Sequence, residues 1–182
     1  MTVKEVVLLA AEELGLGESV AAHLSGGAEG ERETAELLRA FNLVENEIAL
    51  DYLPLYSEEE IESETGVIRF DGLSRAAVRI LRVCDEYGNK LPFRLFPEWL
   101  KTQAGKVKIA YTYSPKEKGL EDKSDYVLQA SPRLLAYGIA AEYSLTKGLF
   151  EEAAVWDKKY KDALTAAYRA RPSRILRSRR WA

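Results

Sequence analysis

The sequence contains one cysteine, Cys84, and one histidine, His23. A single cysteine excludes an internal disulfide and a zinc site built from several thiolates. A serine–histidine–acid arrangement would have to use His23, and no strained nucleophile-elbow sequence accompanies any serine. We therefore predict a non-enzymatic protein with no catalytic residues, no metal and no cofactor. We expect His23 to be a solvated side chain beside a glycine-rich loop, and Cys84 to be a small buried apolar residue.

Long apolar runs are also missing, and none approaches the ~18 residues that a membrane-spanning helix needs. The first 15 residues place acids among their apolar side chains and show no cleavage pattern, so we expect neither a membrane span nor a signal peptide. The 182 residues are 47% hydrophobic and 30% charged. This composition is typical of a globular chain with one domain, or with one domain and a small insert.

No phosphate-binding or metal-binding motif is present. The glycine-rich segment 23–30 lacks the lysine and the serine or threonine of a phosphate loop. Five glutamates lie within residues 58–64, and adjacent acids of this kind are typical of a solvated connector, which we predict here. A carboxylate pair of the glycosidase type leaves no trace in one sequence, and no feature favours it.

Helical spacing marks the first part of the chain. Apolar residues recur every three or four positions over residues 3–14, with Thr2 and Glu5 in a capping-box arrangement and Gly15 as a stop. A longer helix is predicted over residues 31–53, where Pro54 ends it. Its expected buried stripe consists of Leu37, Phe41, Val44, Ile48 and Tyr52, and Leu38 and Leu53 widen it.

The pattern then changes to that of strands. Residues 67–70, 78–83, 91–96 and 106–113 are strand-like, and a turn signal at residues 87–89 separates the second from the third. The strict alternation in the last segment favours a sheet with one buried face. We predict an antiparallel β-region of about four strands.

Helical spacing returns at Ser131-Pro132, which is typical of a helix start. One helix is expected from there to residues 147–148, and a second from residue 149 to about residue 167, with Trp156 on its buried face. Pro172 limits the second helix.

The predicted fold class is therefore α+β and mainly α: a four-helix bundle that carries a small inserted antiparallel β-region and an extended C-terminal arm. The expected boundaries are residues 1–56 and 126–168 for the bundle, 57–125 for the β-region and 169–182 for the arm.

The arm carries a marked excess of positive charge. Its basic residues are Arg169, Arg171, Arg174, Arg177, Arg179 and Arg180. Its apolar residues are Ile175, Leu176 and Trp181. Because the whole chain has a net charge of -3, the remainder carries -9, and the charge is polarised along the chain. Two interpretations stay open: a basic terminus with affinity for nucleic acid, and a docking arm that inserts into an acidic groove of another subunit.

Several runs resemble the head-to-tail adaptor, or connector, proteins of tailed bacteriophages, including the tail tubular A proteins of podophages. The resemblance covers most of the chain through element order and sequence texture. The runs are AFNLVENEIALDYLPL (residues 40–55), VIRF (67–70), FRLFPEWLKTQAGKVKIAYTYSP (93–115), AYGIAAEYSLTKGLFEEAAVWDKKYKDAL (136–164) and the arginine–tryptophan end.

The resemblance implies a virion protein of the neck, assembled in the host cytoplasm as a homo-oligomeric ring, commonly dodecameric. Its C-terminal arm, residues 169–181, would grip the portal protein, and a tail or nozzle protein would bind below. DNA would pass through the lumen without specific recognition, since an acidic body lets DNA slide.

Three alternatives remain. The first is another phage neck or tail-completion protein, for example a hexameric one, with a different partner. The second is a small nucleic-acid-binding protein that uses its arginine tail. An enzyme would require a deep polar pocket with a strongly shifted carboxylate.

Overall fold

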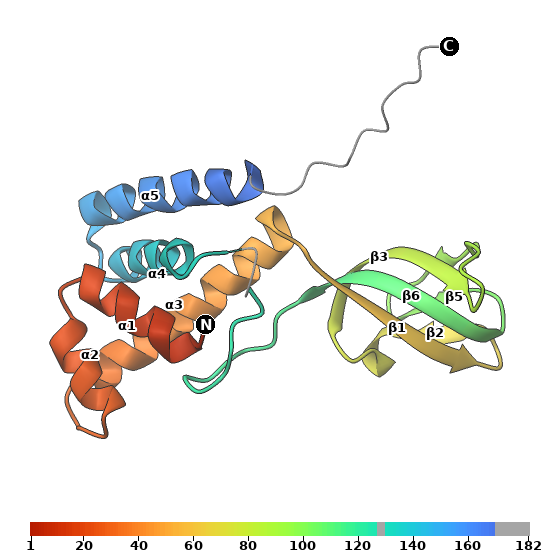
Figure 1. Ribbon diagram of the computed structural model, residues 1–182, viewed down its shortest axis with the longest axis horizontal. Helices are drawn as coiled ribbons and strands as arrows, with labels where there is room; N and C mark the ends of the chain where they lie inside the picture. The colour runs from red at the N-terminus through yellow and green to blue at the C-terminus, as the bar shows by residue number, and fades with distance from the viewer. Residues whose placement is uncertain (127–129, 170–182) are drawn as a thin grey trace, which may run out of the picture. The chain divides into compact units, whose positions relative to one another are not determined.

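The computed structural model describes residues 1–126 and 130–169 (Figure 1). The chain is mixed α/β and divides into two compact units, one formed by residues 1–44 with the part from residue 119 onward, the other by residues 45–118. We call these the helical unit and the β unit. The predicted insert, residues 57–125, begins and ends later in the chain than the β unit.

Five α-helices lie in the described residues: α1 (Val3–Glu13), α2 (Gly17–Leu24), α3 (Glu31–Glu47), α4 (Pro132–Thr146) and α5 (Phe150–Arg169). Six strands follow one another in the β unit: β1 (Leu55–Ser63), β2 (Val67–Arg69), β3 (Ala76–Asp85), β4 (Arg94–Leu95), β5 (Trp99–Lys101) and β6 (Gly105–Ser114). None of the described helices combines the length and the apolar composition that a bilayer span requires.

The capping signals of α1 and α4 are confirmed. The backbone N–H of Thr2 donates to the Glu5 carboxylate over 2.7 Å, and the Thr2 hydroxyl accepts from the Glu5 N–H. Ser131 caps α4 by accepting from the Leu134 N–H, with Pro132 in the first turn. Gly15, with a φ of 73°, ends the first helical segment in the left-handed conformation that glycine tolerates. These ends follow from short-range hydrogen bonding.

Helix α2 was not predicted. It has only eight residues, buries the single apolar residue Val20, and has no side-chain cap, so it lacks the usual sequence signals. His23 lies in its last turn, where Nδ1 is 3.2 Å from the carbonyl oxygen of Gly27. The glycine-rich segment thus begins as the end of a helix.

The central element of the helical unit is α4, which lies between α1 and α5 (Figure 1). Nine of its 15 residues are buried, so it is covered on several sides. A Cβ atom at Gly138 would lie 2.6 Å from Val44 and 2.9 Å from Tyr160. Only glycine therefore allows α4 to approach α3 and α5 this closely.

Helix α5 buries a narrow stripe of Ala153, Tyr160 and Leu164. The prediction that Trp156 is a core residue is wrong, because the stripe passes beside it. The indole is half-buried, stacks on Tyr137 with ring centroids 5.9 Å apart, and is covered by the Lys159 ammonium at 3.9 Å. Trp156 contributes to a surface stack of aromatic and cationic side chains.

The predicted helix over residues 31–53 ends where Pro54 requires, but its last turn is a π-helix, η1 (Ile48–Tyr52). The Leu53 N–H donates to the Ile48 carbonyl over 2.7 Å. A π-turn contains an extra residue, so it rotates the buried stripe. Leu53, expected to widen the stripe, is buried, whereas Tyr52, expected within the stripe, is 39% exposed.

The β unit contains two three-stranded antiparallel sheets, with strand orders β1-β6-β3 and β2-β5-β4. Their shared core consists of Ile68, Leu73, Val83, Leu100, Val107, Ile109 and Tyr111. The strands predicted at residues 67–70, 78–83 and 106–113 are present as β2, β3 and β6. The segment 91–96 is a strand only at Arg94–Leu95, and β5 was missed. Cys84 is buried, as predicted.

The prediction that residues 58–64 form a solvated connector is wrong for most of the segment, because residues up to Ser63 belong to β1. All nine residues of β1 are in register with β6. Burial alternates along β1, so Tyr56, Glu58, Glu60 and Glu62 face outward. The repulsion among these acids is offset because basic side chains of β6 and β3 lie close to them.

Candidate functional site

The outer face of the β1-β6-β3 sheet carries a ladder of charges. Glu58 on β1 and Arg82 on β3 are both in register with Ala110 on the central strand β6. Arg82 Nη2 donates to Glu58 Oε2 over 2.7 Å, above the small alanine side chain. This hydrogen bond raises the pKa of the Arg82 guanidinium further. Both side chains are about half exposed, so the pair contributes less to stability than to the arrangement of charge.

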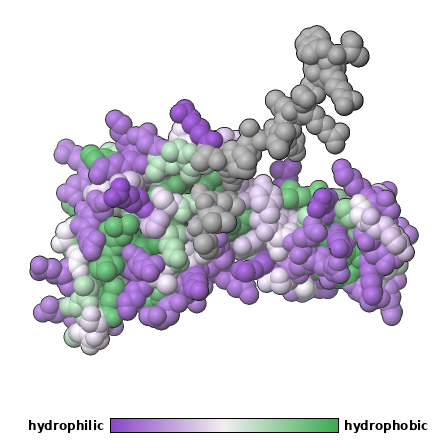
Figure 2. Space-filling model, viewed as in Figure 1, coloured by the Kyte–Doolittle hydropathy of each residue, from purple (hydrophilic) through white to green (hydrophobic). Residues whose placement is uncertain are grey.

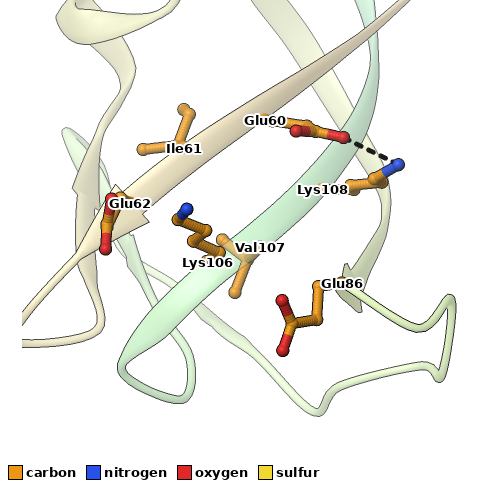
Figure 3. A pocket seen from close by; sticks show the side chains of 7 residues that line it. All are labelled: Glu60, Ile61, Glu62, Glu86, Lys106, Val107 and Lys108. Atoms are coloured by element: carbon orange, nitrogen blue, oxygen red, sulfur yellow. Dashed lines mark ion pairs between the residues drawn. The ribbon is translucent and has the colours of Figure 1, made fainter.

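A second pair joins β1 to β6 two residues further along β1, on the same face. Lys108 Nζ lies 2.7 Å from Glu60 Oε1, and this bond holds the pKa of Glu60 below its usual value (Figure 3). The two residues line an open hollow on the sheet. Its lining residues are Glu60, Ile61, Glu62, Glu86, Lys106, Val107 and Lys108.

The acids of the hollow are not grouped as metal ligands in the described residues. Across residues 1–126 and 130–169, no group of three or more histidine, cysteine or acidic side chains is placed to hold a metal ion. The carboxylate of Glu60 is paired with Lys108, and this bond stabilises its ionised form. Most of the visible surface of the β unit is hydrophilic, with small apolar areas between charged side chains (Figure 2).

Glu59 is the one acid of β1 that points toward the interior of the β unit and makes hydrogen bonds there. It accepts from the Ser74 N–H at 3.1 Å, from the Ser74 hydroxyl at 2.6 Å and from the Tyr111 hydroxyl. Burial opposes ionisation of this carboxyl, but the hydrogen bonds from Ser74 and Tyr111 outweigh it and lower its pKa. Glu59 therefore ties the segment before β3 to β1 as a carboxylate acceptor.

Two further edge strands, β3 and β4, border an apolar groove. Its lining residues are Phe70, Ala77, Val78, Arg79, Ile80, Leu95 and Phe96. β3 has register shifts between Ala77 and Arg79 and between Ile80 and Arg82, which leave Val78 and Leu81 as extra residues with exposed side chains. Bulges of this kind re-aim side chains at a sheet edge.

The predicted docking arm lies mainly outside the described residues. Arg169 is the last residue of α5, where it and its neighbour Tyr168 are exposed. The other predicted arm residues, Arg171, Arg174, Ile175, Leu176, Arg177, Arg179, Arg180 and Trp181, lie beyond the described part.

Sequence reasoning missed the opposed charges of β1 and β3. The signal was present: residues 55–64 contain five glutamates and no basic residue, and residues 75–84 contain three arginines and no acid. Their relationship emerges only when both segments pair with β6. Comparisons of the sequence with protein-family models and with curated proteins found no match. The function must therefore be argued from the charge, the surfaces and the fold.

Proposed function

We propose that this protein is a structural head-to-tail adaptor of a tailed bacteriophage, without enzymatic activity. It forms an oligomeric ring, dodecameric in the family it resembles, below the portal protein. Its C-terminal arm docks into the portal, and a tail or nozzle protein binds on the other side. In the virion, DNA passes through the lumen of the ring without being recognised.

The observation that carries this proposal is the separation of charge along the chain. The last 14 residues contain six arginines and no acid, whereas the rest of the chain has a net charge of -9. An arm with this charge is repelled by an arginine-rich surface and attracted by an acidic groove. Arginine and tryptophan are frequent interface anchors, and the arm contains both.

The fold is compatible with the family's architecture. In this proposal α1, α3, α4 and α5 correspond to its four-helix bundle, α2 is an addition, and the β unit is the insert that contacts neighbouring subunits. Close approach of α3, α4 and α5 around Gly138 supports a bundle, as does the packing of α1 on α4. In a ring, weak binding by each short arm is sufficient, since the arms of many copies act together.

The experiment is capture of the purified portal protein of the same phage by the full chain and by a chain lacking residues 170–182. We expect the full chain to capture the portal protein and the truncated chain to fail to do so. The circular dichroism spectra of the two chains should be the same. A control in which the six arginines become lysine separates charge from the bidentate geometry of arginine.

The same experiment separates the alternatives. Salt-dependent binding of duplex DNA that is lost with residues 170–182, together with no portal capture, would identify a nucleic-acid-binding protein. Capture by a different neck protein, with a ring of another copy number, would identify a tail-completion protein. Portal capture that survives the truncation would refute the docking arm.

A further inference from the structure

Two edges of the β unit have complementary chemistry. On one side, β1 is an edge strand of the β1-β6-β3 sheet and presents Glu58, Glu60 and Glu62 outward. On the opposite edge of the same sheet, β3 presents Arg79 and Arg82, which are both exposed. Within the chain Glu58 pairs with Arg82 and Glu60 with Lys108, whereas Glu62 on one edge and Arg79 on the other form no ion pair in the described residues.

Each edge also has an apolar component. Tyr56, which is 60% exposed, precedes the acids of β1 on the outward face. The groove beside β3 exposes Val78, Leu95 and Phe96, by 52%, 56% and 38%. A tyrosine followed by acids therefore lies at one edge, and an apolar groove lined by Arg79 at the other.

We propose that the groove between β3 and β4 receives the β1 edge of a second copy of this chain. The Tyr56 side chain enters the apolar groove, and the acids of β1 lie toward Arg79, the arginine that lines the groove. Because the two surfaces differ, the contact is head-to-tail, and repeating it generates a closed ring or an open filament. The inference rests on the ring of the proposed function and names the surface that joins its copies.

Continuous strand pairing along β3 is not part of this proposal. The Leu91 N–H donates to the Val83 carbonyl over 2.8 Å, so the chain itself covers the end of β3. The two bulges disrupt the remainder of the edge, as they do in sheets that avoid edge-to-edge pairing. Side chains, rather than a shared ladder, make the contact.

The arm of this chain is the other conceivable occupant, and charge argues against it. Residues 170–182 contain five arginines and no acid, and would meet Arg79 at the groove. Like charges across an interface disfavour association. The β1 segment 55–64, with five glutamates, has the opposite sign.

Charge reversal at two residues tests the proposal. Glu62 and Arg79 make no ion pair within the part of the chain that the structure describes, so replacing them leaves the internal pairs of the sheet intact. Self-association of the full chain is measured by sedimentation velocity over a concentration series. We expect Glu62→Lys alone, and Arg79→Glu alone, to weaken association about tenfold or more.

Restoration is the decisive result. The double variant Glu62→Lys/Arg79→Glu, and an equal mixture of the two single variants, should associate within about threefold of the unaltered chain, because each interface again joins opposite charges. Lys158→Glu, an exposed reversal on α5, is the control and should change nothing. Single reversals without effect, or a double variant no better than the singles, overturn the proposal.

A matched pair of tyrosine substitutions tests the apolar contact. Tyr56→Ala should weaken association about tenfold or more, whereas Tyr87→Ala, at a more exposed tyrosine of the same unit, should not. Equal effects of the two substitutions overturn the role of Tyr56. Melting curves of every variant exclude loss of folding as the cause.

Truncation distinguishes this inference from the proposed function. A chain without residues 170–182 should lose portal capture but keep its self-association. Loss of self-association on truncation would place the arm in the groove and overturn the inference. A full chain that stays monomeric at every concentration, alone and with the portal protein, would overturn it as well.

Discussion

Lys147, the residue that follows α4, forms an ion pair with Glu36 on α3, with Nζ 2.5 Å from Oε2. The pair joins two helices that are more than 100 residues apart in sequence. It is about one-quarter exposed at each side chain, so solvent only partly screens it. The hydrogen bond from Lys147 stabilises the ionised carboxylate and lowers the pKa of Glu36 below 4.5.

This shift predicts a dependence of stability on pH. A lowered carboxyl pKa contributes stability above its ordinary value of 4.5, and that stability is lost as the pH falls through the folded-state pKa. Glu36→Gln should therefore lower the free energy of unfolding by up to about 1 kcal/mol at neutral pH. The difference should shrink toward zero as the pH falls to about 2 in urea titrations. Glu31→Gln, an exposed acid on the same helix, is the control, and a difference that is constant with pH would contradict the assignment.

The close approach at Gly138 predicts that Gly138→Ala destabilises the helical unit. Alanine has the higher helix propensity by about 1 kcal/mol, but the added methyl group would clash with Val44 and Tyr160. Overpacking of this kind costs about 1–3 kcal/mol, so a lower melting temperature is expected. Gly72→Ala provides the comparison, because a Cβ there meets no atom within 4 Å. A more stable Gly138→Ala variant would show that the helices separate without penalty.

The stack at Trp156 predicts a moderate effect of truncation. Trp156→Ala should lower the free energy of unfolding by about 1–2 kcal/mol, since the indole is half-buried against Tyr137 and Lys159. Leu164→Ala, at a residue that is 5% exposed on the same helix, should have the larger effect of about 2–5 kcal/mol. Denaturant titrations of both variants give the order directly, and the reverse order would place Trp156 in the core.

The docking arm predicts a specific role for Trp181. If its ring fills a pocket of the portal protein, Trp181→Ala should weaken docking by ~2 kcal/mol or more, which is about thirtyfold in Kd. Trp99→Ala is unsuitable as a control because that indole stacks on Phe96 within the β unit, at 3.8 Å between centroids. Tyr87→Ala alters an exposed aromatic residue away from the arm and serves instead. Equal portal affinity of both variants would remove Trp181 from the contact.

Local signals in the sequence were sufficient for several elements. The Thr2–Glu5 capping box, the Ser131-Pro132 helix start and the alternation over residues 106–113 each depend on groups a few residues apart, and each is present in the structure. The expected stripe of α3 is buried as far as Ile48. The π-turn after it depends on packing and rotated Tyr52 out of the stripe.

What the sequence by itself determined is therefore the ends of its capped helices, the strand character of its alternating segments and the separation of charge between the body and the last 14 residues. Tertiary structure alone decided that the glutamates of β1 form a strand. Their partners Arg82 and Lys108 lie 24 and 48 residues further along the chain, and no short-range pattern records that pairing. Pairing between segments far apart in sequence also placed an acidic and a basic edge on one sheet. Strand order depends on the free energy of the whole β unit and not on any one segment.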